Sequence, residues 1–115
     1  MKIQTQYCQD ILSRIEQIER FTHDGKQAFM ADDRTQEAVI RCFEVIGEAI
    51  RRMDANLLAK YSHFAWSDYI GFRNVLIHQY DMIQIDKIWQ SVEEDIEPLK
   101  QIILTILADI QKDDV

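Results

Sequence analysis

Apolar residues recur every three or four positions along most of the chain, which is the spacing that places them on one face of an α-helix. From residue 3 to residue 21 they predict a first helix. We expect it to end near Gly25, because glycine readily takes the left-handed conformation that terminates helices. A second helix is predicted to begin at Asp32 or Asp33, either of which can cap its free amide groups, and to end near Arg52.

Two more helices are predicted in the second half of the chain. A connector over residues 54–65, with one possible turn at residues 56–59, leads to a third helix from about Trp66 to about His78. The fourth runs from about Asp86 to residue 110, with a kink expected at Pro98 because proline lacks the amide hydrogen that the helix ladder needs. The sequence therefore predicts an all-α fold, an up-and-down helical bundle of four main helices that forms one domain over residues 1–115.

Composition and charge narrow the functional classes. The longest apolar run, residues 102–108, is too short to cross a bilayer, and the first residues do not resemble a secretory signal, so we expect a cytoplasmic protein. Cys8 and Cys42 lack metal-ligand spacing and are predicted to be buried thiols.

The formal charge of −7 argues against generic nucleic-acid binding. Residues 79–115 carry nine acids and three bases, whereas residues 41–78 carry five bases and four acids, so a local phosphate site is permitted there.

The spacing of the histidines, acids, serines and glycines gives little support for a metal site or for a nucleophilic active site. A di-iron bundle needs two Glu-x-x-His pairs, and the chain has none. The histidines at 23, 63 and 78 fall in separate segments, and no serine is flanked by the glycines of a nucleophile elbow. Gly47 is predicted to allow close helix packing rather than phosphate binding, because the three glycines are far apart. We therefore predict neither a metal nor a cofactor.

The segment from Arg73 to Tyr80 carries the strongest chemical signal, an arginine, a histidine and a tyrosine in the pattern R-x4-H-x-Y. An arginine can bind a phosphate and a histidine can transfer a proton near neutral pH, which suits phosphodiester cleavage without a metal. On the motif alone, a helix-end histidine and an arginine in a surface ion pair are the simpler interpretation. Tyr80 could likewise be a half-buried aromatic residue with a wet hydroxyl.

The helical geometry of the motif bears on this choice. Each residue of an ideal helix advances by about 100°, so Arg73 and His78 lie about 140° apart, whereas Asn74 and His78 stack at i and i+4. A single straight helix cannot direct Arg73 and His78 at one phosphate. Two copies related by a two-fold axis could supply them from opposite sides, so a composite site in a homodimer is the favoured geometry.

Several segments together resemble the HEPN ribonucleases, specifically the HepT-like toxins of MNT–HEPN toxin–antitoxin modules. The segment from Arg73 to Tyr80 fits the R-x4-H-x-Y site of that family. Residues 36–41 and 44–49 resemble its second helix, residues 66–72 the lead-in to the motif, and residues 88–100 its last helix. The likeness covers nearly the whole chain. One departure is Ala65, where similar proteins usually have proline, and this affects the shape of the connector rather than the chemistry.

The resemblance implies a homodimeric, metal-independent RNA endonuclease. In such an enzyme Arg73 would bind the scissile phosphate and His78 would act as general base or acid in attack by the ribose 2′-hydroxyl, with Asn74 orienting His78 or a phosphate oxygen. The products would be a 2′,3′-cyclic phosphate and a 5′-hydroxyl. An MNT-type nucleotidyltransferase antitoxin would inactivate the toxin by AMPylation of Tyr80, because the added phosphate repels RNA.

Two other functions stay open from the sequence. The first is a catalytically inactive HEPN-type bundle that acts as a binding partner of a nucleotidyltransferase, although an intact Arg73, His78 and Tyr80 favours the enzyme. The second is a nucleotide-binding module that leaves RNA intact. The acidic fourth helix fits either a docking surface for an antitoxin or a solvated face.

Overall fold

The computed structural model describes residues 1–113, and every regular element in this range is helical. The predicted all-α fold is therefore confirmed. Five longer helices form the body of the bundle: α1 (Lys2–Phe21), α3 (Asp33–Arg52), α5 (Trp66–His78), α6 (Ile85–Glu94) and α7 (Ile96–Asp113). Three short elements lie in the connections: α2 (Lys26–Met30), α4 (Ala55–Ala59) and a single 3₁₀ turn, η1 (Tyr80–Met82). No helix in the described range is long and apolar enough to span a membrane.

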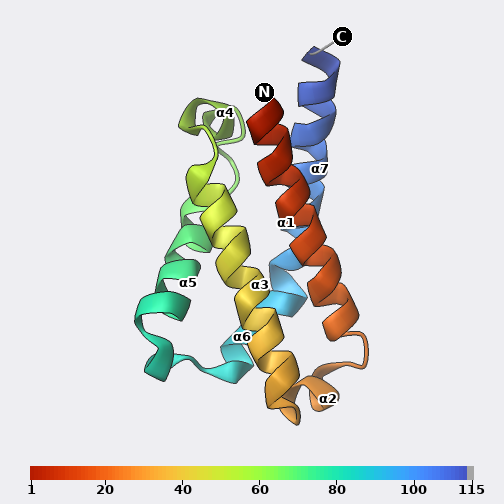
Figure 1. The fold of residues 1–115 in the computed structure, drawn as a ribbon, viewed down its shortest axis with the longest axis vertical. Helices are drawn as coiled ribbons and strands as arrows, with labels where there is room; N and C mark the ends of the chain where they lie inside the picture. Colours follow the sequence, from red (N-terminus) through yellow and green to blue (C-terminus); the bar gives the residue numbers. More distant parts are fainter. Residues whose placement is uncertain (114–115) are drawn as a thin grey trace.

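Helix α3 lies at the centre of the bundle, with α1 packed on one side and α5 on the other (Figure 1). Helix α7 packs against α1, and α6 connects the base of the bundle to α7. The short α2 packs against α3 and α6. Helix α5 therefore lies at the edge of the bundle, where α3 is its main neighbour.

One continuous hydrophobic core joins these helices. The longer helices contribute buried residues at spacings of three and four, as the sequence pattern predicts. Burying one large apolar side chain stabilises the fold by about 1.5–3 kcal/mol, so this core is the main source of stability. Its largest fully buried side chains in the central α3 and the last helix are Val39, Ile46, Ile50, Leu99, Ile103 and Ile106.

The start of α3 follows the predicted capping. One carboxylate oxygen of Asp32 accepts a hydrogen bond from the backbone N–H of Arg34 at 3.0 Å, and the other accepts one from the hydroxyl of Thr35 at 2.9 Å. Gly25 has a positive φ of 92°, but with a ψ of −178° it is not in the left-handed helical conformation predicted for it, and it precedes the short α2 rather than capping α1, which ends at Phe21 with Thr22 as its cap. The sequence pattern does not predict α2, because five residues are too few to establish a helical period.

The fourth predicted helix is interrupted at Asp95, so the kink predicted at Pro98 is placed three residues too late. Pro98 lies in the first turn of α7, where it cannot donate to the carbonyl of Glu94 and its ring crowds that carbonyl. The disruption therefore falls in the turn before the proline. The hydroxyl of Tyr69 donates to the carbonyl oxygen of Asp95 at 2.8 Å, which links α5 to this interruption.

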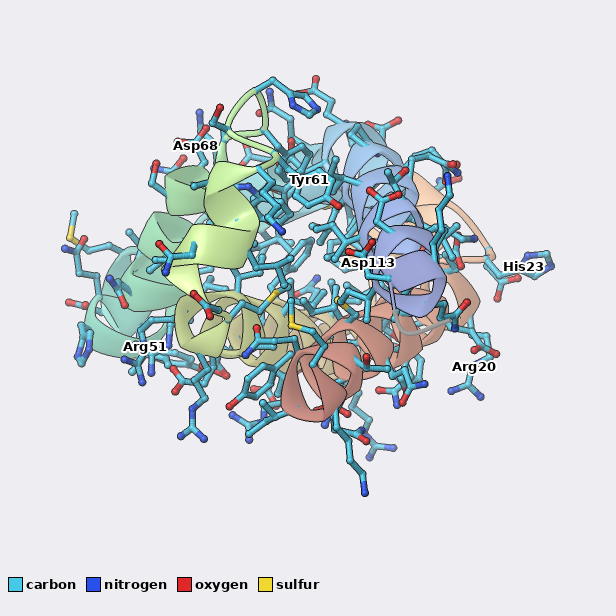
Figure 2. The ribbon with its side chains drawn as sticks, turned by 90° about the horizontal axis from the view of Figure 1, so that it is seen from above. Arg20, His23, Arg51, Tyr61, Asp68 and Asp113 are labelled. Atoms are coloured by element: carbon cyan, nitrogen blue, oxygen red, sulfur yellow. The ribbon has the colours of Figure 1, made fainter. Side chains whose placement is uncertain are left out.

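The connector between α3 and α5 is held against the core by two aromatic residues. The indole N–H of Trp66 donates to the carbonyl oxygen of Tyr61 at 3.2 Å, and the hydroxyl of Tyr61 donates to the carboxylate of Asp109 in α7 at 2.5 Å. Figure 2 shows Tyr61 inside the bundle, whereas Arg20 and His23 project from its rim. Because Trp66 is the first residue of α5, these contacts fix where the motif-bearing helix begins.

Candidate functional site

The R-x4-H-x-Y motif occupies the second half of α5 and the turn η1 that follows it. On the side of α5 that faces the bundle, Leu76 is fully buried, and the ring of Phe72 packs edge-on against Phe43 of α3 with ring centroids 5.2 Å apart. These apolar contacts fix the rotation of α5 about its own axis. They therefore determine the directions in which the polar residues of the motif point.

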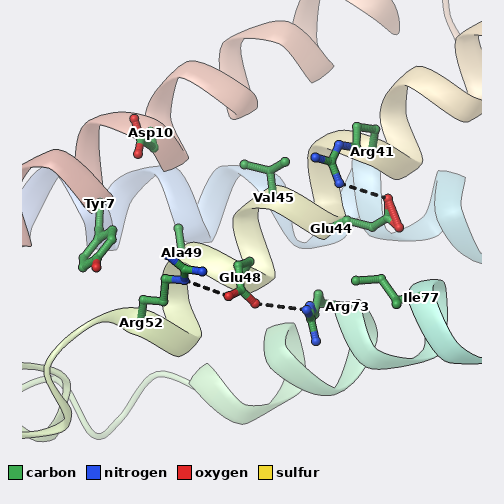
Figure 3. A pocket seen from close by; sticks show the side chains of 10 residues that line it. All are labelled: Tyr7, Asp10, Arg41, Glu44, Val45, Glu48, Ala49, Arg52, Arg73 and Ile77. Carbon is green, nitrogen blue, oxygen red and sulfur yellow. Dashed lines mark hydrogen bonds and ion pairs between the residues drawn. The ribbon is translucent and has the colours of Figure 1, made fainter.

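Arg73 points toward α3, where its guanidinium meets the carboxylate of Glu48 (Figure 3). The Nη2 atom lies 3.1 Å from Oε2, and the two side chains are only 20% and 25% exposed. The other terminal nitrogen, Nη1, donates to Oδ1 of Asn74 at 2.9 Å. The Nε atom is buried and has no hydrogen-bond partner among residues 1–113. Arg73 is thus a largely buried arginine that is paired with a carboxylate.

Glu48 binds two further arginines, both from the end of its own helix. Arg51 donates to both carboxylate oxygens, at 2.7 and 3.1 Å, and Nε of Arg52 donates to Oε1 at 2.8 Å. The hydrogen bonds from Arg51 and Arg52, together with the nearby charge of Arg73, lower the pKa of Glu48 to about 2. One carboxylate is therefore paired with three guanidinium groups. Together these four side chains carry a net charge of +2, in a chain whose formal charge is −7.

Gly47 allows α3 and α5 to approach closely beside Arg73. A Cβ atom placed on Gly47 would lie 2.3 Å from Cβ of Arg73 and 2.9 Å from its Cγ, distances that folded proteins do not tolerate. Glycine is therefore required at this position while the helices keep their separation. This confirms the prediction that Gly47 serves helix packing.

An open cavity of about 240 Å³ lies between α1, α3 and α5, and Arg73 forms part of its wall (Figure 3). Three arginines and three carboxylates line it, so its charge is balanced. Tyr7 and Ile77 supply apolar surface on opposite sides. His78 is not among the lining residues. The charged residues of the wall are Asp10, Arg41, Glu44, Glu48, Arg52 and Arg73.

The outward face of α5 is uncovered and carries His78, the last residue of the helix. Asn74 precedes His78 by four residues and Gly71 by seven, and all three are exposed. A Cβ atom on Gly71 would meet no atom within 4 Å, in contrast to Gly47. Apolar side chains continue this surface into η1, where Tyr80 is 65% exposed. The other exposed apolar residues here are Val75 and Met82, whereas the exposed Ile77 lies on the side of the cavity.

The structure thus brings some of the predicted site residues together and leaves others apart. Arg73 and Asn74 are hydrogen-bonded to each other, whereas His78 lies on the outward face and Tyr80 in the following turn. Sequence reasoning does not single out Glu48, because its contact with Arg73 joins residues on different helices. The sequence feature that points to Glu48 is the pair of arginines three and four positions after it, because residues at these spacings are neighbours on the surface of a helix. Within residues 1–113, no group of three or more metal-ligating side chains is arranged to hold a metal ion.

The fold and the site define a HEPN-like helical bundle with an R-x4-H-x-Y motif on its edge helix. Comparison with protein families gives the closer assignment: the family described as "Ribonuclease HepT-like" matches residues 11–106. The chain therefore belongs to the HepT-like ribonuclease family. No solved structure gives a significant match.

Curated relatives agree with this assignment. The chain is 37% identical over 95 residues to "Probable ribonuclease HepT" of Thermococcus cleftensis, which covers 82% of this chain and 86% of that protein. It is 33% identical over 107 residues to a "Putative RNase" of Methanocaldococcus jannaschii, with 92% of both chains covered. It is also 36% identical over 107 residues to a "Gamma-glutamylcyclotransferase and putative RNase" of the same organism, of which it spans 48%.

Proposed function

We propose that this protein is a metal-independent RNA endonuclease that acts as a homodimer in the cytoplasm, with residues 1–115 forming one HEPN-like domain. The observation that carries the proposal is the intact set of Arg73, Asn74 and His78 on an edge helix whose outward face is uncovered. Membership of a family described as ribonucleases supports RNA as the substrate. The names of the curated relatives support the same substrate class.

Gly71 supports a second copy of the chain at the outward face of α5. Glycine inside a helix costs about 0.5–1 kcal/mol relative to alanine, and no atom of the described chain lies close enough to require it. A closely approaching helix would require it. Val75, which is 38% exposed and lies one turn from Gly71, would be covered by the same contact. Arg73 lies about 160° from Gly71 around α5, so Arg73 of one copy and His78 of the other would flank a phosphate at the rim of this contact.

In the proposed reaction His78 accepts the proton of the ribose 2′-hydroxyl, and the 2′-oxygen attacks phosphorus. The bond from phosphorus to the 5′-oxygen breaks, and the leaving oxygen takes a proton from water or, where it is intact, from the second His78 of the dimer. Arg73 neutralises the charge that develops on the phosphate, and Asn74 orients His78 or a phosphate oxygen. The products are a 2′,3′-cyclic phosphate and a 5′-hydroxyl.

The protein is further proposed to be the toxin of a type II toxin–antitoxin module whose antitoxin is an MNT-type nucleotidyltransferase. The exposure of Tyr80, two residues after His78, supports its role as the modified residue. The tyrosine oxygen would attack the α-phosphorus of ATP, with pyrophosphate leaving and the hydroxyl proton released. The attached AMP would repel RNA from His78. A Tyr80→Phe variant should keep ribonuclease activity and no longer accept AMP, as mass spectrometry of the intact protein can determine.

The test is cleavage of total RNA in EDTA by purified protein that mass spectrometry has found free of AMP. Arg73→Ala and His78→Ala should abolish cleavage, whereas His63→Ala, which alters an exposed histidine of the connector, should not. All variants should keep the dimer mass of the parent. Cyclic-phosphate ends are expected on the products. If the unmodified parent leaves RNA intact, the protein is instead a catalytically inactive binding partner of a nucleotidyltransferase.

Mixing the two inactive variants tests whether the site is shared between copies. A mixed dimer of Arg73→Ala and His78→Ala chains has one intact Arg73 facing one intact His78, so partial cleavage should return on mixing. Absence of any recovery, with mixed dimers detected by native mass spectrometry, would contradict the shared site.

A further inference from the structure

We propose that Glu48 is a positioning residue of the catalytic site, which holds the guanidinium of Arg73 in the orientation that meets the scissile phosphate. The inference rests on the proposed ribonuclease function. It concerns a residue of α3, outside the R-x4-H-x-Y motif, that the motif chemistry leaves without a role.

Glu48 reaches Arg73 from a neighbouring helix and inside a partly buried setting. The contact measures 3.1 Å between Nη2 and Oε2, and at most a quarter of either side chain is exposed. Buried charges are screened less than exposed ones, so this pair holds its geometry better than a surface pair. The contrast is the pair of Arg41 with Glu44 on the same helix, where the atoms are 3.8 Å apart and the arginine is 67% exposed.

Two contacts fix the plane of the Arg73 guanidinium. Glu48 holds Nη2 in an ion pair at 3.1 Å and Asn74 accepts a hydrogen bond from Nη1, so hydrogens on both terminal nitrogens are left for a phosphate. An unrestrained arginine loses much of its rotamer freedom when it is ordered. Ordering Arg73 before the substrate arrives removes that cost from the reaction.

Glu48 can hold Arg73 without cancelling the attraction of the site for phosphate, because its charge is shared. Arg51 and Arg52 contact the same carboxylate, and their side chains are 52% and 59% exposed. The three guanidinium groups therefore retain an excess of two positive charges around one carboxylate. A carboxylate paired with Arg73 alone would leave no excess positive charge.

The experiment compares the RNA cleavage kinetics of Glu48→Gln with those of Glu37→Gln, a control that removes an exposed carboxylate of α3 outside the cavity wall. Removing the ion pair that holds Arg73 should lower kcat by about tenfold or more. The KM for RNA should stay the same or fall, because the cluster becomes more positive. Glu37→Gln should leave both constants unchanged. A purely structural role would instead lower kcat only in proportion to the fraction of folded enzyme, which unfolding measurements on the same preparation give.

A second variant separates the cross-helix contact from the contacts at the end of α3. The double variant Arg51→Gln/Arg52→Gln keeps the Glu48–Arg73 pair, so it should retain kcat and raise KM. If it loses kcat as Glu48→Gln does, Glu48 acts through the end of α3 and the proposal is overturned. An unchanged kcat in Glu48→Gln also overturns it, and a raised kcat would mean that Glu48 restrains Arg73. In each of these outcomes the parent still cleaves RNA, whereas an inactive parent overturns the proposed function as well.

Discussion

Gly47 of α3 lies directly against Arg73 of α5, with no space between them for even a methyl group. A Cβ atom on Gly47 would lie 2.3 Å from Cβ of Arg73 and 3.0 Å from the carbonyl oxygen of Tyr69. The nearest obstacle is the base of the arginine side chain, which cannot rotate out of the way. The pairing of Arg73 with Glu48 therefore depends on the absence of a side chain at the residue before Glu48.

The first prediction concerns Gly47→Ala. Overpacking typically costs about 1–3 kcal/mol, whereas replacing a helical glycine by alanine returns about 1 kcal/mol, so we expect a net loss of stability. RNA cleavage should fall as well, because α5 must move away from α3 and carry Arg73 with it. Urea unfolding and cleavage assays on the same preparation measure both effects. A variant as stable and as active as the parent would mean that the helices can separate freely at this point.

The second prediction concerns the other helical glycine, Gly71, whose surroundings within the chain are open. Gly71→Leu should fit the isolated chain without a clash but obstruct a second α5 at the outward face. We expect the protein to shift from dimer to monomer and to lose cleavage while it stays folded. Ala108→Leu adds a similar side chain at an exposed position of α7 and should remain dimeric. A dimeric, active Gly71→Leu protein, judged by analytical ultracentrifugation, would place the interface elsewhere.

The sequence predicts the long helices well because their signals are local. The bounds of α3 follow from the carboxylate cap at Asp32 and from an apolar period sustained to Met53. The turn η1 cannot be read in the same way, since three residues carry no period. The interruption at Asp95 is displaced from Pro98 because proline disturbs the carbonyl four residues earlier rather than its own position.

The candidate site is predictable only in part, because one of its main contacts joins residues on different helices. The spacing within α5 separates Arg73 from His78, and the structure places Arg73 in a cavity wall that His78 does not share. The contact between Glu48 and Arg73 joins residues 25 positions apart on two helices. It depends on the rotation of both helices and on their close approach at Gly47, which no local spacing specifies. The simpler interpretation of the motif, an arginine in a surface ion pair, is therefore right about the ion pair but not about the surface, because the Arg73 side chain is only 20% exposed. The ion pair does not exclude a role in binding phosphate.

The third prediction concerns the thiols, which are buried as the sequence analysis expects. Burial raises the pKa of Cys8 to about 11 and also raises the pKa of Cys42. Because the thiolate is the reactive form, neither residue should react with a disulfide reagent at about pH 8 while the protein is folded, and both should react in urea. Release of the coloured thiolate product measures this. Rapid labelling of the folded protein would indicate local opening of α1 or α3.

The last prediction is that Glu48 makes the stability of the folded protein depend on pH. The pKa of Glu48 is about 2 in the folded protein, against an ordinary value of 4.5. A carboxyl group with a lowered pKa contributes stability that is fully present above the ordinary value and is lost as pH falls through the folded value. Between about pH 5 and pH 2 the unfolding free energy of the parent should therefore fall more steeply than that of Glu48→Gln.

Urea unfolding midpoints at a series of pH values give both curves, and the quantity of interest is the difference between them. That difference should shrink as the pH falls, because protonated Glu48 can no longer attract three guanidinium groups. Parallel curves would mean that the carboxylate is not bound by Arg51, Arg52 and Arg73 in solution. The electrostatic basis for holding Arg73 would then be absent, whatever the cleavage assays had found.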